Sequence, residues 1–233
     1  MAELIDITIG ELLKRTAAEH PSRSAIEYLG RTWTWEEVDR VSDDVARGLL
    51  AHGVYKGCHV GIFAPDRPSF IIFMLAIVKI GAVAVHINPM LVCSELEALL
   101  ASADVEFLGV GSVHKDRDLR EVVHSLPEMP LLKEVIYLGD TLDDSDDIRK
   151  LLADGHEFEK TPEGRGCLEK AAADVKPSDI ATILFTSGTT GMPKAVLISH
   201  HSRVNNARLQ AEDLRATCEA RFCIAIPMLH CFC

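Results

Sequence analysis

Basic residues are scarce in this chain of 233 residues. Lys and Arg total 24 against 35 Asp and Glu, which leaves a formal net charge of −11 at pH 7. Nucleic acids and anionic membrane surfaces attract proteins with basic surfaces. The charge balance therefore argues against both as partners, and we expect no nucleic acid to bind.

The chain also lacks the patterns of a secreted, disulfide-bonded protein. Residues 1–8 contain no Lys or Arg, so they do not form the basic start of a secretory signal. The cysteines number seven, and an odd number without repeated spacing does not indicate a disulfide framework. A reducing compartment fits these cysteines better, and we expect a cytoplasmic location.

No stretch of the sequence predicts a membrane span. The most apolar run, residues 70–87, contains Lys79 and is interrupted by Gly81. Its first part predicts a buried helix at 68–80, and its β-branched second part predicts a buried strand ending at Ile87. With 48% hydrophobic residues, the chain has ample material for a core.

A metal site is not indicated either. Cys223, His230, Cys231 and Cys233 lie close together, but they lack the C-x-x-C pair that is typical of structural zinc sites. The acidic run at 140–147 lacks the glycine and the final glutamate of an EF-hand loop. We therefore assign no metal-ligating residue and expect the acidic run to be a solvated loop.

Strand and helix patterns alternate along the chain, which favours an α/β fold with a parallel-rich, helix-covered sheet. Capping boxes are predicted at Thr34 with Glu37 and at Ser94 with Glu97. We expect residues 1–139 to form a first α/β lobe, residues 140–176 an acidic connecting region, and residues 177–233 the start of a second α/β lobe. Helices are expected at 9–20, 35–52, 68–80, 95–102, 114–125, 148–154 and 202–215, and strands at 25–29, 31–34, 59–63, 82–87, 105–110, 134–138, 180–185, 195–199 and 222–226.

The segment 186–194, Thr-Ser-Gly-Thr-Thr-Gly-Met-Pro-Lys, lies between two apolar strand patterns. Glycines let a backbone approach a ligand closely, successive N–H groups form an anion-binding nest, and the hydroxyl groups and the lysine add donors and positive charge. An ordinary turn is the alternative, but most hairpin loops have only about 2–5 residues. The sequence predicts a polyphosphate-binding loop that consists of Thr186, Ser187, Gly188, Thr189, Thr190, Gly191 and Lys194.

This loop differs from the P-loop of Walker-type nucleotidases. In that motif the lysine follows the second glycine directly and a hydroxyl residue follows the lysine. Here Met192 and Pro193 separate Gly191 from Lys194. A residue before proline avoids helical conformation, so we expect the loop to join two strands rather than a strand and a helix.

Several segments together resemble the adenylate-forming superfamily, which includes acyl-CoA synthetases, aryl-CoA ligases, luciferases and peptide-synthetase adenylation domains. The loop with its preceding Leu-Phe is similar to the phosphate-binding loop of that family, and the resemblance covers nearly the whole chain but only the amino-terminal portion of the family. The other similar segments are 33–37 (Trp-Thr-Trp-Glu-Glu), 61–65 (Gly-Ile-Phe-Ala-Pro), 79–89, 198–200 (Ile-Ser-His) and 226–232 (Ile-Pro-Met-Leu-His-Cys-Phe).

The resemblance implies the large amino-terminal α/β domain of an acyl-CoA synthetase, in incomplete form. It implies ATP, Mg²⁺ and coenzyme A as cofactor and co-substrates, and a fatty or other carboxylic acid as substrate. In the family, the histidine that matches His230 borders the carboxylate-substrate site. No segment matches the family's magnesium-holding Tyr-Gly-x-Thr-Glu, its ribose-binding Thr-Gly-Asp or its carboxy-terminal catalytic lysine.

Two interpretations follow. In the first, the chain is an amino-terminal fragment of an ATP-dependent carboxylate–CoA ligase, is inactive alone, and associates into a homo-oligomer through residues 222–233. In the second, it is a non-catalytic nucleotide-binding or dimerising module. The acyl chain length stays open, because most pocket-lining positions of the family have no counterpart here.

Overall fold

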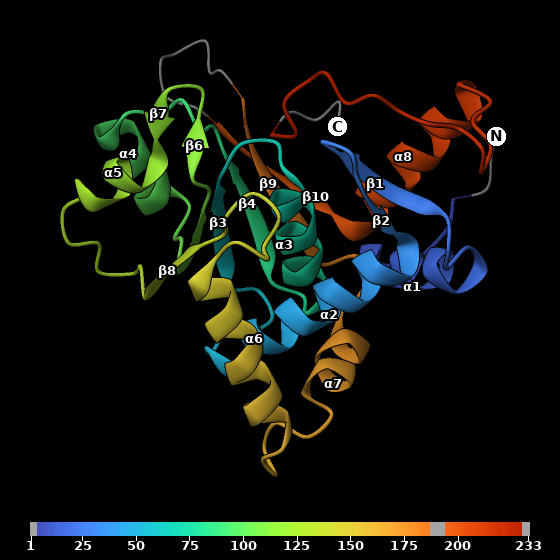
Figure 1. The fold of residues 1–233 in the computed structure, drawn as a ribbon, viewed down its shortest axis with the longest axis horizontal. Helices are drawn as coiled ribbons and strands as arrows, with labels where there is room; N and C mark the ends of the chain where they lie inside the picture. Colours follow the sequence, from blue (N-terminus) through green and yellow to red (C-terminus); the bar gives the residue numbers. More distant parts are fainter. Residues whose placement is uncertain (1–3, 187–193, 230–233) are drawn as a thin grey trace.

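A six-stranded sheet forms the centre of the computed structural model, which describes residues 4–186 and 194–229 (Figure 1). The strand order is β10-β9-β4-β3-β5-β8. All neighbours are parallel except β10, which pairs antiparallel with β9. The strands are β3 (His59–Phe63), β4 (Val83–Ile87), β5 (Phe107–Val110), β8 (Glu134–Tyr137), β9 (Ile180–Thr186) and β10 (Lys194–Ser199). The predicted α/β fold with a parallel-rich sheet is confirmed.

Helices cover both faces of this sheet. One face packs against α2 (Trp35–Ala51), α3 (Pro68–Lys79), α6 (Asp146–Glu159) and α7 (Cys167–Asp174). The other packs against α4 (Cys93–Ser102) and α5 (Leu119–His124). Beside α2 lie α1 (Ile9–Glu19) and the hairpin of β1 (Ser24–Tyr28) and β2 (Arg31–Thr34), which share a small core around Trp33. Two short strands, β6 (Val113–His114) and β7 (Arg117–Asp118), and the helix α8 (His200–Asp213) complete the described elements.

Local signals position several helix ends as the sequence predicts. Thr34 and Glu37 form the capping box of α2, with both hydrogen bonds present. Gly81 has φ +74°, a conformation that glycine adopts without strain, and it separates α3 from β4. The predicted cap at Ser94 is wrong: α4 begins at Cys93, because the Glu95 carboxylate accepts the hydrogen bond of the Val92 N–H group.

Three expected elements differ from the structure. The helix expected at 114–125 is shorter, because the β6–β7 hairpin occupies its first part. The helix expected at 148–154 is longer, since α6 spans Asp146–Glu159, and α7 was not expected; Ile148, Leu151 and Leu168 of these two helices are buried. The strand expected at 222–226 does not form, and its large apolar side chains are exposed.

The helices α2 and α6 touch backbone to backbone where they cross. A Cβ atom added to Gly155 would lie 2.6 Å from the Gly48 nitrogen, and one added to Gly48 would lie 2.5 Å from the Leu151 oxygen. Both distances are shorter than real Cβ contacts. The two glycines therefore allow a crossing that no larger residue permits.

The division of the chain into two lobes at residues 140–176 stays a prediction. In the described residues, β9 follows this region in sequence but pairs with β4, which precedes it. Strands from both predicted lobes thus belong to one sheet. The apolar run at 70–87 forms most of α3 and all of β4, and within residues 4–186 and 194–229 no helix is long and apolar enough to cross a membrane.

The helix α8 is tied to the amino-terminal segment by side chains on its inner face. His200 accepts a hydrogen bond at Nδ1 from the Ile9 N–H group, at 3.2 Å. Asn205 bonds both backbone groups of Ile5, at 2.8 and 2.9 Å. His200 is fully buried, and burial lowers its pKa to about 4. The ring is therefore neutral at pH 7.

This burial predicts a loss of stability in acid. The unfolded chain protonates His200 below its ordinary pKa of 6.5, whereas the folded chain resists protonation until about pH 4. The free energy of unfolding should therefore fall as the pH drops from 6.5 to 4, with His200 contributing on the order of 3 kcal/mol by pH 4. Urea unfolding across this range measures the loss. His200→Asn keeps an acceptor near Nδ1 but does not titrate, so its curve should be flatter, and parallel curves would contradict the assignment.

Candidate functional site

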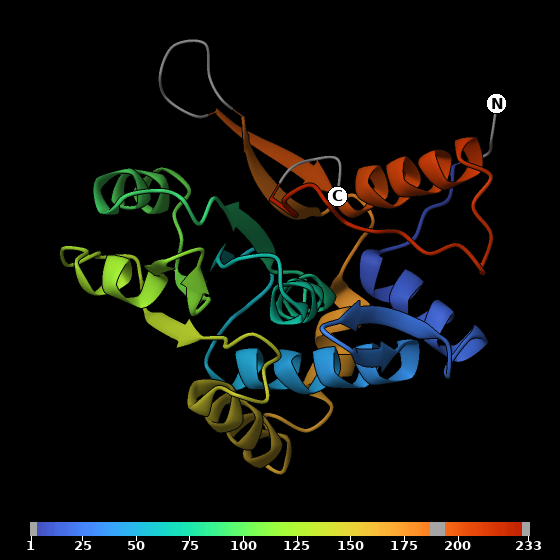
Figure 2. The same ribbon diagram turned by 45° about the horizontal axis from the view of Figure 1, so that its top comes forward.

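The predicted phosphate-binding loop begins at the carboxyl edge of the sheet. The strand β9 is parallel to β4 and ends at Thr186, so both strands end on the same side (Figure 2). In open α/β sheets, ligands bind outside the carboxyl ends of the strands. The chain returns as β10, which confirms the prediction that the loop joins two strands.

The two ends of the loop are adjacent. Thr186 and Lys194 are register partners of the β9–β10 hairpin, and the Thr186 hydroxyl lies 3.5 Å from the Lys194 carbonyl oxygen. Both residues are exposed. The structure therefore places one threonine and one lysine, both exposed, at the two ends of the loop. The other predicted phosphate contacts, Ser187, Gly188, Thr189, Thr190 and Gly191, lie outside the described residues.

The carboxy-terminal segment reaches the same edge. The Met228 N–H group donates to the Asp66 carboxylate at 2.9 Å, and Asp66 follows the carboxyl end of β3. The Met228 carbonyl oxygen lies 3.2 Å from Nδ1 of His86, in β4. His230, the predicted acyl-substrate residue, lies outside the described residues, two positions after Met228.

Sequence reasoning assigned no role to Asp66 or His86. The signal was present at His86, which interrupts the otherwise apolar strand Val-Ala-Val-His-Ile. The ring is 3% exposed and packs edge-to-face against Phe70, with ring centroids 5.3 Å apart. Burial is the main cause that lowers its pKa to about 4, so the ring is neutral near pH 7 and carries one N–H group.

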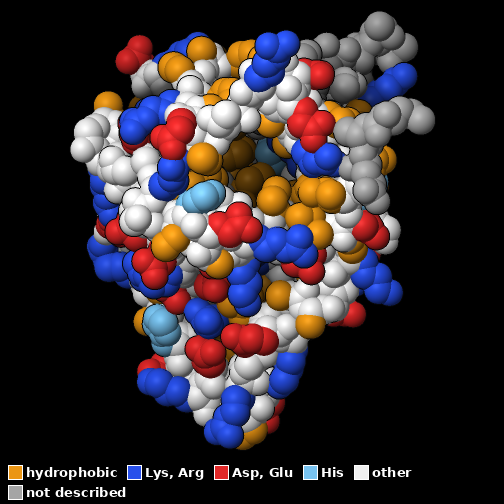
Figure 3. All heavy atoms as spheres, turned by 90° about the vertical axis from the view of Figure 1, so that its right-hand side faces the viewer, with side chains coloured by type: hydrophobic (Ala, Val, Ile, Leu, Met, Phe, Trp, Pro, Cys, Tyr) orange, Lys and Arg blue, Asp and Glu red, His pale blue; other side chains and the backbone are white. Residues whose placement is uncertain are grey.

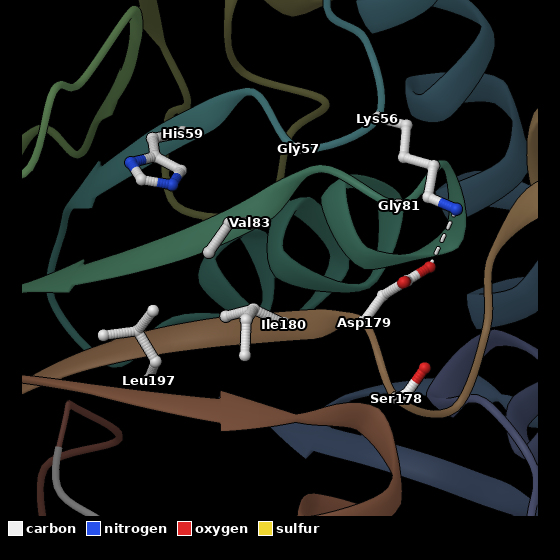
Figure 4. A pocket seen from close by; sticks show the side chains of 9 residues that line it. All are labelled: Lys56, Gly57, His59, Gly81, Val83, Ser178, Asp179, Ile180 and Leu197. Carbon is white, nitrogen blue, oxygen red and sulfur yellow. Dashed lines mark ion pairs between the residues drawn. The ribbon is translucent and has the colours of Figure 1, made fainter.

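A pocket of about 370 Å³ lies at the opposite edge of the sheet, around the amino ends of β3, β4 and β9. Its charged groups are paired, since Lys56 Nζ lies 2.9 Å from the Asp179 carboxylate (Figure 4). His59, at the start of β3, points one ring nitrogen at the Ala103 carbonyl oxygen, 2.7 Å away. None of the predicted site residues lines this pocket, and we assign it no function.

No metal site is built by the part of the chain that the structure describes. Within it, no three His, Cys, Asp or Glu side chains gather in a way that holds an ion. Cys223 is the one described residue of the four His and Cys residues near the end of the chain that were considered as zinc ligands, and it is exposed. We therefore assign no magnesium ligand within residues 4–186 and 194–229.

Two known proteins match this chain along nearly its whole length. One is YngI of Bacillus subtilis, which is named provisionally as an acyl-CoA synthetase. The two sequences are 32% identical, and the match covers 100% of this chain and 44% of YngI. The chain is also 30% identical to the acyl-CoA ligase sidI of Aspergillus fumigatus, across 98% of this chain and 39% of that protein. The chain thus spans less than half the length of these relatives.

Solved structures share the fold. A long-chain-fatty-acid-CoA ligase from Archaeoglobus fulgidus superimposes with a TM-score of 0.77 and 23% identity, covering 98% of this chain and 44% of the other. The family model described as AMP-binding enzyme matches residues 13–233. This match includes the loop at 186–194 and the segment that Asp66 and His86 hold. The chain belongs to the AMP-binding enzyme family.

Proposed function

We propose that this chain is the amino-terminal part of an ATP-dependent carboxylate–CoA ligase that acts on a fatty or other carboxylic acid. The observation that carries the proposal is the position of Thr186 and Lys194. They are paired across the β9–β10 hairpin and exposed at the carboxyl edge of a parallel sheet, where such sheets bind ligands. Membership of the AMP-binding enzyme family supports the same reaction class.

In the proposed reaction, a carboxylate attacks the α-phosphate of ATP and gives an acyl-adenylate and pyrophosphate. The thiol of coenzyme A then attacks the acyl carbonyl and releases AMP. The loop from Thr186 to Lys194 holds the β- and γ-phosphates with its N–H groups, its hydroxyls and the lysine charge. Mg²⁺ supplies further charge neutralisation when ATP binds, and His230 borders the carboxylic acid.

The remaining assignments belong to the same proposal. The connecting region at 140–176 separates a first lobe from the start of a second lobe that carries the phosphate loop. The protein acts in the cytoplasm, and no nucleic acid takes part in its function. Because the chain holds no segment for ribose, magnesium or the catalytic lysine, residues 1–233 alone bind polyphosphate but do not complete either half-reaction.

The phosphate assignment predicts that Lys194→Ala weakens polyphosphate binding. Loss of one charge-assisted hydrogen bond costs about 1.5–3 kcal/mol, so the Kd for tripolyphosphate should rise by about 10- to 100-fold. Isothermal titration calorimetry at low salt measures the change. Lys160→Ala is the matched control, because Lys160 is exposed and pairs only locally with Glu157. Equal weakening in both variants would mean that net charge, rather than the loop, attracts the anion.

The missing segments predict that residues 1–233 are catalytically silent. With ATP, magnesium and a panel of carboxylic acids of different length, pyrophosphate release should stay at the background rate, while tripolyphosphate binding persists. A coupled pyrophosphate assay makes the measurement. Turnover above background that depends on the acid would show that the chain holds a complete adenylation site.

The outer strand predicts self-association. β10 lies at one end of the sheet, with Val196 and Leu197 exposed by 41% and 57%, and Phe222 and Ile224 of the tail are exposed as well. Open strand edges and apolar patches pair with other chains, so residues 1–233 should form a dimer or larger oligomer. Sedimentation equilibrium under reducing conditions is the test. Leu197→Lys should shift the protein toward monomer. Leu131→Lys is the control, because Leu131 is also exposed but lies outside this surface, and it should leave the oligomeric state unchanged. A wild-type monomer at tens of micromolar would contradict this surface.

A further inference from the structure

Three buried side chains carry a polar atom that has no hydrogen-bond partner within residues 4–186 and 194–229. They are Nε2 of His86, Oγ1 of Thr182 and Nε2 of His200. Thr182 and His200 are fully buried, and His86 is 3% exposed. The other two atoms of this kind are the Nε atoms of Arg47 and Arg67, whose side chains form ion pairs. A buried polar atom without a partner costs stability, so native proteins bond nearly all such atoms, and internal water supplies many of these bonds.

His86 and Thr182 lie on one face of the sheet. Thr182 of β9 is the register partner of Ala84 of β4 in a parallel pairing, so these two side chains point to the same face. Residues two apart in a strand share a face, which places His86 on this face as well. With strands about 4.8 Å apart and a rise of about 3.3 Å per residue, the Cα atoms of His86 and Thr182 are about 8 Å apart. One water molecule, with two hydrogen bonds of about 2.8 Å, fits between side chains at this separation.

The side chains beside these two polar residues are small. Ala84, two residues before His86 and opposite Thr182, is fully buried. Ala181, next to Thr182 in β9, is fully buried as well. An alanine leaves more space beside its neighbours than any larger apolar residue, and a buried water needs only about 10–15 Å³ of accessible space. The small side chains therefore favour water over a larger ligand.

The hydrogen-bonding character of the three atoms also selects water. Nδ1 of His86 faces the Met228 carbonyl oxygen at 3.2 Å, which only accepts, so the neutral ring carries its proton on Nδ1 and its Nε2 is an acceptor. Nδ1 of His200 accepts from the Ile9 N–H group, so the proton of this ring is on Nε2, which is a donor. The Thr182 hydroxyl can donate and accept. An anion cannot donate to His86 and a metal cation cannot accept from His200, whereas water does both.

The helix α8 borders the same part of the sheet. His200 begins α8, and its N–H group donates to the Asp179 carbonyl oxygen, just before β9. Besides burial, the positive charge of Arg203, one turn further along α8, lowers the pKa of His86, so α8 extends from the start of β9 toward His86. Figure 3 views the side of the molecule that carries α8, and it shows a hollow with hydrophobic side chains inside it. Water therefore reaches into the molecule on this side.

We propose that water is bound between β4, β9 and α8, where it bridges Oγ1 of Thr182 and Nε2 of His86, with Nε2 of His200 as a further donor. The backbone register of β4 with β9 ends at Val85 and Ile183, and His86 lies one residue beyond this end. The water bridge therefore extends a pairing that the backbone holds over only two register pairs. It strengthens the attachment of the strand that leads to the predicted phosphate loop, whether or not the chain is part of a ligase.

A crystal structure of residues 1–233, at a resolution that shows ordered water, tests the site directly. Electron density for water should lie within hydrogen-bond distance of both Thr182 Oγ1 and His86 Nε2. Thr182→Ser keeps the hydroxyl and should keep this water, whereas Thr182→Val should lose it. Absence of the density in the wild-type protein, or its persistence unchanged in Thr182→Val, would overturn the proposal. A direct bond from another side chain to either atom would do so as well.

The direction of a stability change gives a second test in solution. Valine has nearly the shape of threonine but no hydroxyl, so Thr182→Val would lower the unfolding equilibrium constant if the hydroxyl had no partner. With the water bridge, the same exchange removes hydrogen bonds, and the constant should rise by about fivefold in urea unfolding. Thr32→Val is the control, because Thr32 is exposed in β2, and it should change the constant by less than about twofold. A Thr182→Val protein more stable than the wild type would overturn the proposal.

Discussion

The parallel pairing of β9 with β4 is the constraint on which the candidate site depends. It is short, with Ala84 opposite Thr182 and Val85 opposite Ile183 as its register partners. Because parallel neighbours end on the same side, this register brings the end of β9 to the edge where β3 and β4 also end. The end of β9 at Thr186 and the Met228 backbone lie at one edge for this reason, although they come from different parts of the chain.

Buried polar side chains join the later elements of the chain to the earlier ones. His200 and Asn205 of α8 bond the backbone of Ile9 and Ile5, and His86 of β4 bonds that of Met228. In each case the side chain bonds a backbone group of the partner residue. A substitution of the partner's side chain therefore keeps the group that is bonded. Apolar packing alone is non-directional, so these bonds supply the directional part of the tertiary contacts.

The sequence predicted elements well where the signal is local. The alternation of helices and strands up to β8, the capping box at Thr34 and the hairpin around the phosphate loop depend on neighbouring residues, and they appear in the structure. In the region 140–176 the helix at 148–154 was predicted, but α7 was not, because a helix whose buried residue is Leu168 alone gives little apolar periodicity. The strand expected at 222–226 has strong β propensity, but propensity forms a strand only where a neighbouring strand accepts it. Asp66 and His86 were missed because their partner lies far away in the sequence, and no local pattern reports such a contact.

The order of synthesis gives the β4–β9 pairing a further consequence. β4 leaves the ribosome long before β9, with α4, α5 and α6 in between. Until β9 arrives, the side of β4 that later pairs with it has no strand partner within this sheet. Pairing between strands so distant in the chain is slow, because the intervening loop must close first. Between the synthesis of β4 and that of β9, the nascent protein therefore exposes a hydrophobic parallel edge, and transiently unpaired strand edges of this kind are prone to aggregation.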